Sequence, residues 1–139
     1  MKKDCDKVLV IPCSGIGKVN GLISRESCYL VTDELAPATT DVVCLALLVR
    51  ADEETLAKVR AHPCITIDGC GKACADKNVE IAGGRVAEAF QVGTALRDHR
   101  GTQPGTGSEL TGDGWAISRE IAEAVAESAA RICAGEAVA

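Results

Sequence analysis

Short apolar runs alternate with helical stretches along this chain, and this alternation constrains its fold more than any other feature. The runs at residues 7–13, 41–49 and 64–68 are rich in β-branched residues, as expected of strands buried on both faces. Residues 85–92 supply a fourth strand. Because the stretches between them are helical, we expect the strands to pair in parallel through right-handed βαβ units. The pattern predicts an α/β fold: one Rossmann-like or flavodoxin-like domain with four parallel strands flanked by helices.

Helical segments are predicted from apolar residues that recur at three- and four-residue spacings. We expect them over residues 17–34, from Ala51 to the His62-Pro63 pair, over 70–82 and over 115–133. Residues 100–114 are dense in Gly and Thr and predict a long loop, which is either a lid or disordered. No internal repeat or linker divides the chain. Residues 1–139 are therefore expected to form a single domain that begins with a polar tail at residues 1–6.

The composition excludes several classes of function. The formal net charge is −5 and no block of consecutive Lys or Arg occurs, so nucleic-acid binding and binding to anionic membranes are not expected. The apolar run near the N-terminus is short and is preceded by charged residues, unlike that of a signal peptide. No segment approaches the ~18 apolar residues of a membrane span. The expected location is the cytoplasm.

Eight cysteines are many for a chain of 139 residues. In a reducing compartment, clustered cysteines bind metals or take part in redox chemistry more often than they form disulfides. If a helix begins at Cys70, then Cys70 and Cys74 lie four residues apart on one helical face, and both sulfurs can reach the same ion. The N-terminus of that helix would also favour the thiolate form of Cys70, which is the form that binds metal.

The carboxyl ends of neighbouring parallel strands meet at one edge of a sheet, where a crevice opens. Cys13 ends the first predicted strand and Cys70 follows the third, so the two converge there if these strands are neighbours. Cys44 joins them if the second strand stops near that residue. Four thiolates around one ion are typical of structural zinc, but they equally suit an iron–sulfur cluster.

The other cysteines and Asp68 have weaker signals. Packing or incidental roles are expected for the four remaining cysteines, which are Cys5, Cys28, Cys64 and Cys133. Cys28 and Cys64 are the likelier spare ligands among them. The Asp68 carboxylate either caps the helix that follows it or orients the metal ligands through the N–H groups of the adjacent turn. These two roles are compatible.

Three short motifs resemble those of the DGC family, which is named for its Asp-Gly-Cys triplet. They are CSG at 13–15, CLA at 44–46 and IDGC-x3-CA at 67–75, and the resemblance extends over residues 7–90. The four cysteines of this family are expected to bind zinc. Carried over residue by residue, the resemblance implies the ligands Cys13, Cys44, Cys70 and Cys74. Gly71 stands where a Pro is expected, a difference that concerns the turn more than the ligation.

Alternative chemistries find less support in the sequence. The glycines at 15, 17 and 21 are typical of a dinucleotide-binding loop, but no acidic residue closes the second strand. A phosphatase-like or arsenate-reductase-like cysteine loop would need an Arg where Val19 stands. No C-x-x-C motif is present. His62 and His99, the only imidazoles, are expected at the surface.

Two functional hypotheses from different classes follow from these observations. The first is a metal-binding protein, with zinc preferred, whose site leaves room for a small ligand or a sulfur-containing substrate. The second is a thiol-redox or sulfur-handling enzyme in which either Cys70 or Cys13 is a reactive thiolate, or the same four cysteines hold an iron–sulfur cluster. An interaction domain with buried cysteines is a third option. The family has no established reaction, so no catalytic residue is assigned and enzymatic activity stays open, as does the oligomeric state.

Overall fold

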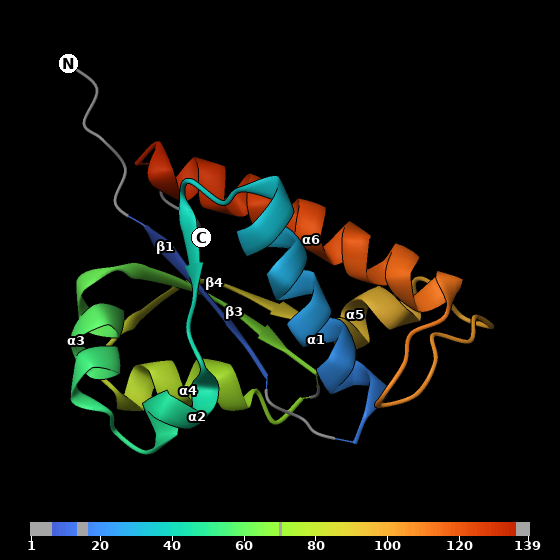
Figure 1. The fold of residues 1–139 in the computed structure, drawn as a ribbon, viewed down its shortest axis with the longest axis horizontal. Coiled ribbons are helices and arrows are strands. Elements are labelled where there is room, and N and C mark those ends of the chain that lie inside the picture. The colour runs from blue at the N-terminus through green and yellow to red at the C-terminus, as the bar shows by residue number, and fades with distance from the viewer. Residues whose placement is uncertain (1–6, 14–16, 70, 136–139) are drawn as a thin grey trace.

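A four-stranded, all-parallel sheet forms the centre of the molecule, with the order β2-β1-β3-β4 (Figure 1). The computed structural model describes residues 7–13, 17–69 and 71–135. The four strands are β1 (Val8–Pro12), β2 (Thr40–Val42), β3 (Pro63–Asp68) and β4 (Arg85–Gln91). Val10 of the central strand β1 pairs with Val42 on one side and Ile65 on the other. The predicted parallel α/β fold is confirmed.

Helices cover both faces of this sheet (Figure 1). One face carries α1 (Val19–Leu30), the π-helix η1 (Val31–Leu35), α5 (Val92–Arg97) and α6 (Gly112–Cys133); the other carries α2 (Leu45–Val49), α3 (Glu53–Ala61) and α4 (Cys74–Ile81). None of the helices in the described ranges is long and apolar enough to cross a membrane. The sheet is therefore sandwiched between two helical layers.

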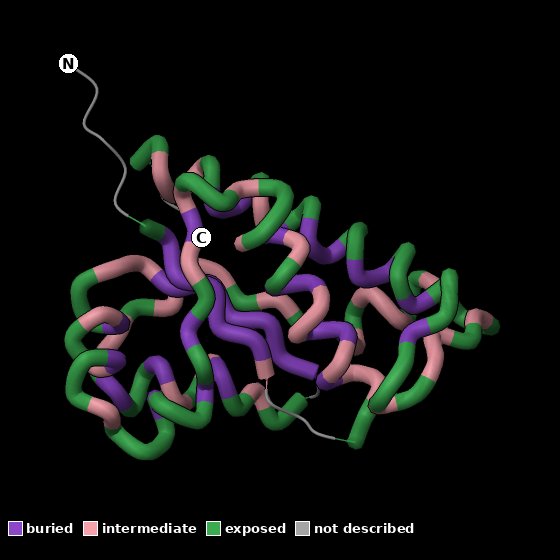
Figure 2. The backbone as a smooth tube through the Cα atoms, in the orientation of Figure 1, coloured by how far each residue is buried: buried purple, intermediate pink, exposed green. Residues whose placement is uncertain are grey.

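The central strands are buried on both sides, which explains their continuous apolar sequence (Figure 2). Successive side chains of a strand point to opposite faces. Val8 and Val10 accordingly pack with α1 and α6, whereas Leu9 and Ile11 pack with residues from α2 and α4. The core is aliphatic, as the scarcity of aromatic residues requires.

Several boundaries differ from the sequence-based predictions. The second strand ends at Val42, and Leu45–Val49 forms the short helix α2, so the apolar run 41–49 holds two elements. The predicted helix over 17–34 divides into α1 and the wider η1. α5 was not predicted, since apolar spacing over so few residues is not distinctive. α6 begins at Gly112 because the side chain of Thr111 accepts a hydrogen bond from the Gly114 N–H at 3.3 Å.

The Gly/Thr-rich loop between α5 and α6 has a defined fold. The N–H of Thr106 donates to the Glu109 carbonyl at 2.9 Å, and the N–H of Thr111 donates to the Pro104 carbonyl at 3.0 Å. Gly107 lies directly against the backbone before α1, where an added Cβ would come within 2.4 Å of the Gly17 carbonyl carbon. The loop therefore packs beside the entrance to α1, and only glycine fits at its closest approach.

Candidate metal centre

The segments that follow β1, β2 and β3 each carry a cysteine, and the strand order places these segments at the same edge of the sheet. Cys13 follows β1 directly, Cys44 lies between β2 and α2, and Cys74 is the first residue of α4, which follows β3. Because β1 lies between β2 and β3, the expectation that the first and third strands are neighbours is confirmed. All three thiols are free; those of Cys44 and Cys74 are exposed and Cys13 is partly exposed.

These three cysteines share an edge without forming a ligand set by themselves. Across residues 7–13, 17–69 and 71–135, no group of three or more His, Cys, Asp or Glu side chains is placed so as to hold a metal ion. Cys70, the residue that gives the Asp-Gly-Cys motif its thiol, lies outside the described residues. The four-cysteine set thus remains a prediction.

The prediction that a helix begins at Cys70 is wrong for the described residues 71–73, which precede the helix. The helix α4 begins at Cys74, and the preceding Ala73 has φ 52°, in the left-handed region. Gly71 and Lys72 form a turn. Cys74 is thus the first helical residue, and the helix offers no residue four positions before it with which to share a face. The helix begins at Cys74 instead of Cys70 because the Asp68 side chain caps the N–H groups of Ala75 and Asp76.

Asp68 is the buried residue that sets the start of α4. Its carboxylate accepts hydrogen bonds from the N–H groups of Ala75 at 2.8 Å and Asp76 at 3.2 Å, and the residue is only 2% exposed. Burial raises the pKa of Asp68, and the two N–H donors offset part of that rise. Asp68 therefore caps α4, as the sequence predicts, and Cys74 is the first residue of that helix.

Helix α1 fixes the backbone on both sides of this edge. The Asn20 side-chain amide donates to the Gly69 carbonyl at 2.9 Å, and the Ser24 hydroxyl lies 3.2 Å from the Cys13 carbonyl. The Cys13 N–H in turn donates to the Ile67 carbonyl at 2.8 Å. Sequence reasoning missed Asn20 and Ser24; their only signal was a polar pair four residues apart on a helix, facing the strand ends.

Gly69 permits the close approach between this turn and α1. A Cβ added at Gly69 would lie 3.2 Å from both the Asn20 carbonyl carbon and the Gly21 nitrogen, which is tighter than ordinary van der Waals contact. The middle residue of the Asp-Gly-Cys triplet is therefore explained by packing. Asp68 holds α4 on one side of it, and Asn20 holds α1 on the other.

Cys28 and Cys64 occupy a different environment. Both are fully buried, and their thiols donate to backbone carbonyls, that of Cys28 to Val10 at 3.8 Å and that of Cys64 to His62 at 3.5 Å. Burial raises the pKa of Cys28 to about 12 and that of Cys64 to about 11. Cys64 also lies near the amino end of β3, opposite the edge that carries the other cysteines. The structure supports packing roles for both.

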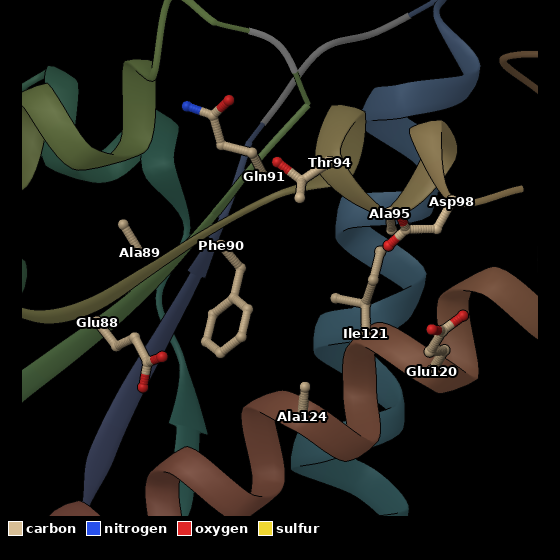
Figure 3. Close-up of a pocket in the computed structure, with 10 residues that line it drawn as sticks. All are labelled: Glu88, Ala89, Phe90, Gln91, Thr94, Ala95, Asp98, Glu120, Ile121 and Ala124. Carbon is tan, nitrogen blue, oxygen red and sulfur yellow. The ribbon is translucent and has the colours of Figure 1, made fainter. Parts of the chain in front are cut away.

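A cavity of about 350 Å³ lies beside β4, away from the cysteines (Figure 3). Phe90 from β4 and Ile121 from α6 face it from opposite sides, and Thr94 and Asp98 contribute from α5 and the residue after it. None of the cysteines that the structure describes lines it. This cavity could not be predicted, because the apolar pattern does not reveal the helix α5 that forms one wall.

Together, the fold and the edge cysteines define a parallel α/β domain with thiols after the carboxyl ends of its strands. The family model of the DGC domain matches residues 9–109, which is more than half of the chain. The chain belongs to the DGC domain family. No curated protein and no solved structure matches it significantly.

Proposed function

We propose that this protein binds a metal ion, zinc by preference, through Cys13, Cys44, Cys70 and Cys74. The observation that carries the proposal is the strand order, since β2, β1 and β3 are neighbours in the sheet. In the sequence, Cys13 follows β1, Cys44 follows β2 and Cys70 follows β3. Membership of the DGC family supports the same set. Four thiolates would give the closed tetrahedral arrangement that is typical of structural zinc.

The donor chemistry fits such an ion. The thiols of Cys13, Cys44 and Cys74 are free and at least partly exposed, so each is accessible to an ion from solution. Because these three do not form a ligand set in the described residues, zinc binding would bring the three connections closer to one another. The ion would then act as a cross-link between the loops after β1, β2 and β3.

Elemental analysis of protein purified without oxygen tests the proposal. We expect a colourless protein with about one zinc ion per chain. Replacing any one of Cys13, Cys44, Cys70 or Cys74 by Ser should remove most of the metal, because a closed site has no spare ligand. Cys28→Ser and Cys64→Ser are the matched controls, since both thiols are buried and bonded to backbone carbonyls. These two variants should retain the metal.

The outcomes separate the two functional classes. A brown protein that contains iron and acid-labile sulfide would contradict the zinc proposal and favour an iron–sulfur enzyme on the same cysteines. If all four edge variants keep as much zinc as the two controls, the ligand assignment is wrong.

A further inference from the structure

A groove of about 220 Å³ lies between α1, η1 and the start of α6, and both Tyr29 and Trp115 line it. Its lining consists of Glu26, Tyr29, Leu30, Asp33, Glu34 and Trp115. Tyr29 and Trp115 are the only Tyr and the only Trp among the 139 residues. Among the described residues, none of the proposed ligands Cys13, Cys44 and Cys74 lines this groove.

The two aromatic side chains of this groove are accessible to solvent. Tyr29 is 42% exposed and Trp115 is 46% exposed. Aromatic residues contribute most to stability when they are buried, and leaving both at one groove forgoes that gain. Clustered, exposed aromatic surface is typical of a binding site. The groove therefore offers two π-systems to a ligand.

The charge of the groove is negative. Three carboxylates line it, and Glu34 is already paired with Arg119 at 3.2 Å. Within the described ranges, neither Glu26 nor Asp33 forms an ion pair. Asp33 lies in η1, where the Ala36 N–H donates to the Val31 carbonyl in the wider π-helical pattern. Two unpaired carboxylates thus lie on the same helical segment as Tyr29.

We propose that this groove binds a small organic cation that carries a methylated ammonium group. Aromatic faces attract such cations through their quadrupole, and weakly hydrated alkylammonium groups are the ligands that aromatic cages recognise best. The carboxylates of Glu26 and Asp33 complement the charge. The volume lies below the ~300–1,000 Å³ of pockets for drug-sized ligands, which restricts the occupant to a small molecule.

Trp115 provides a direct probe, because the intrinsic tryptophan fluorescence of this protein comes from the groove alone. Metal-loaded protein is titrated with choline at constant ionic strength, and in parallel with 3,3-dimethylbutan-1-ol, which has the same shape without the charge. We expect a saturable fluorescence change with choline and none with the neutral alcohol at equal concentrations.

Three substitutions test the two kinds of contact. Tyr29→Ala and Asp33→Asn should each weaken choline binding by roughly two- to fivefold, the effect of losing one exposed cation contact. Tyr29→Phe retains the ring and should bind as the unaltered protein does. Glu54→Gln removes the same charge from α3, on the other side of the sheet, and should also leave binding unchanged. Circular dichroism confirms that each variant is folded.

An equal response to choline and to the neutral alcohol would overturn the proposal, since it would show that charge plays no part. So would choline binding that is unchanged in both Tyr29→Ala and Asp33→Asn, or the absence of any saturable change with choline. Weakening in Glu54→Gln as large as in Asp33→Asn would likewise reject the groove in favour of general electrostatic attraction.

Discussion

The cysteines at the sheet edge and the cysteines in the core differ in almost every property except their chemical identity. Cys13, Cys44 and Cys74 follow strands or begin helices and are accessible, whereas Cys28 and Cys64 are fully buried and donate to backbone carbonyls. Burial disfavours the thiolate, which is the reactive and metal-binding form. The comparison teaches that the position of a cysteine in this fold, and not the number of cysteines, decides which thiols can function.

Alkylation should separate the two sets most strongly. In metal-free protein at pH 8, a thiol with a pKa of about 12 has roughly a thousandfold less thiolate than an ordinary cysteine. Iodoacetamide should therefore modify Cys13, Cys44 and Cys74 at least a hundredfold faster than Cys28, as measured by peptide mass spectrometry over time. Zinc added beforehand should protect the edge set. Equal labelling of Cys28 and Cys44 in folded protein would remove the distinction.

The core thiols should also make the protein less stable in alkali. Their pKa values are raised in the folded state, to about 12 for Cys28 and about 11 for Cys64, so the folded protein keeps protons that the unfolded chain releases above about pH 8.5. This contribution to stability is complete below that pH and is lost as the pH rises. With two such groups, the free energy of unfolding should fall by about 2.7 kcal/mol per pH unit between about pH 9 and 11.

Urea unfolding of metal-free protein at several pH values measures this slope. The double variant Cys28→Ala, Cys64→Ala should lose most of it, because alanine has no proton to release. The variant Cys44→Ala is the matched control and should keep the full slope. A double variant as sensitive to alkali as the unaltered protein would show that other groups cause the effect.

The division between edge and core could be predicted from the sequence only in part. Apolar runs predicted the parallel sheet and placed Cys13 at the end of the first run. Cys44 lies inside the run 41–49, so its place at the edge depended on where the second strand ends, and the family resemblance was needed to assign it. The conformation between Cys70 and Cys74 could not be predicted, because the left-handed Ala73 and the later start of α4 depend on hydrogen bonds from a buried Asp68. Periodicity carries no information about such a tertiary contact.

The groove formed by Tyr29 and Trp115 was missed for a related reason. These two residues are far apart in the sequence and come together only because α6 packs along α1 and η1. Their rarity in the composition was visible, but a single Trp and a single Tyr suggest core residues as readily as a site. Only the exposure of both side chains in one groove separates these interpretations.

Substitution of Asp68 tests how much its cap stabilises the start of α4, where Cys74 lies. Replacing Asp68 by Ala leaves the N–H groups of Ala75 and Asp76 without acceptors at a buried helix start, which should lower the free energy of unfolding by about 2–3 kcal/mol. Asp68→Asn retains one acceptor and should cost about half as much. Urea unfolding of metal-free protein at pH 7 measures both.

Asp52→Ala, which removes the less buried cap of α3, is the control and should cost less than Asp68→Ala. If the two caps prove equivalent, burial at the cysteine edge adds nothing to the stability of the helix start.

The smallest expected effect concerns Asn20, which joins α1 to the residue before Cys70. Asn20→Ala removes the hydrogen bond to the Gly69 carbonyl and should lower the free energy of unfolding by about 1 kcal/mol. Its effect on zinc retention should be larger in proportion, about tenfold in affinity, because partners that orient ligands affect metal binding more than folding. Thr40→Val, which removes a side-chain bond to the Ala36 carbonyl at the amino end of β2, is the matched control and should leave zinc affinity unchanged. A loss of stability in Asn20→Ala with unchanged zinc affinity would mean that α1 supports the sheet edge without positioning the metal ligands.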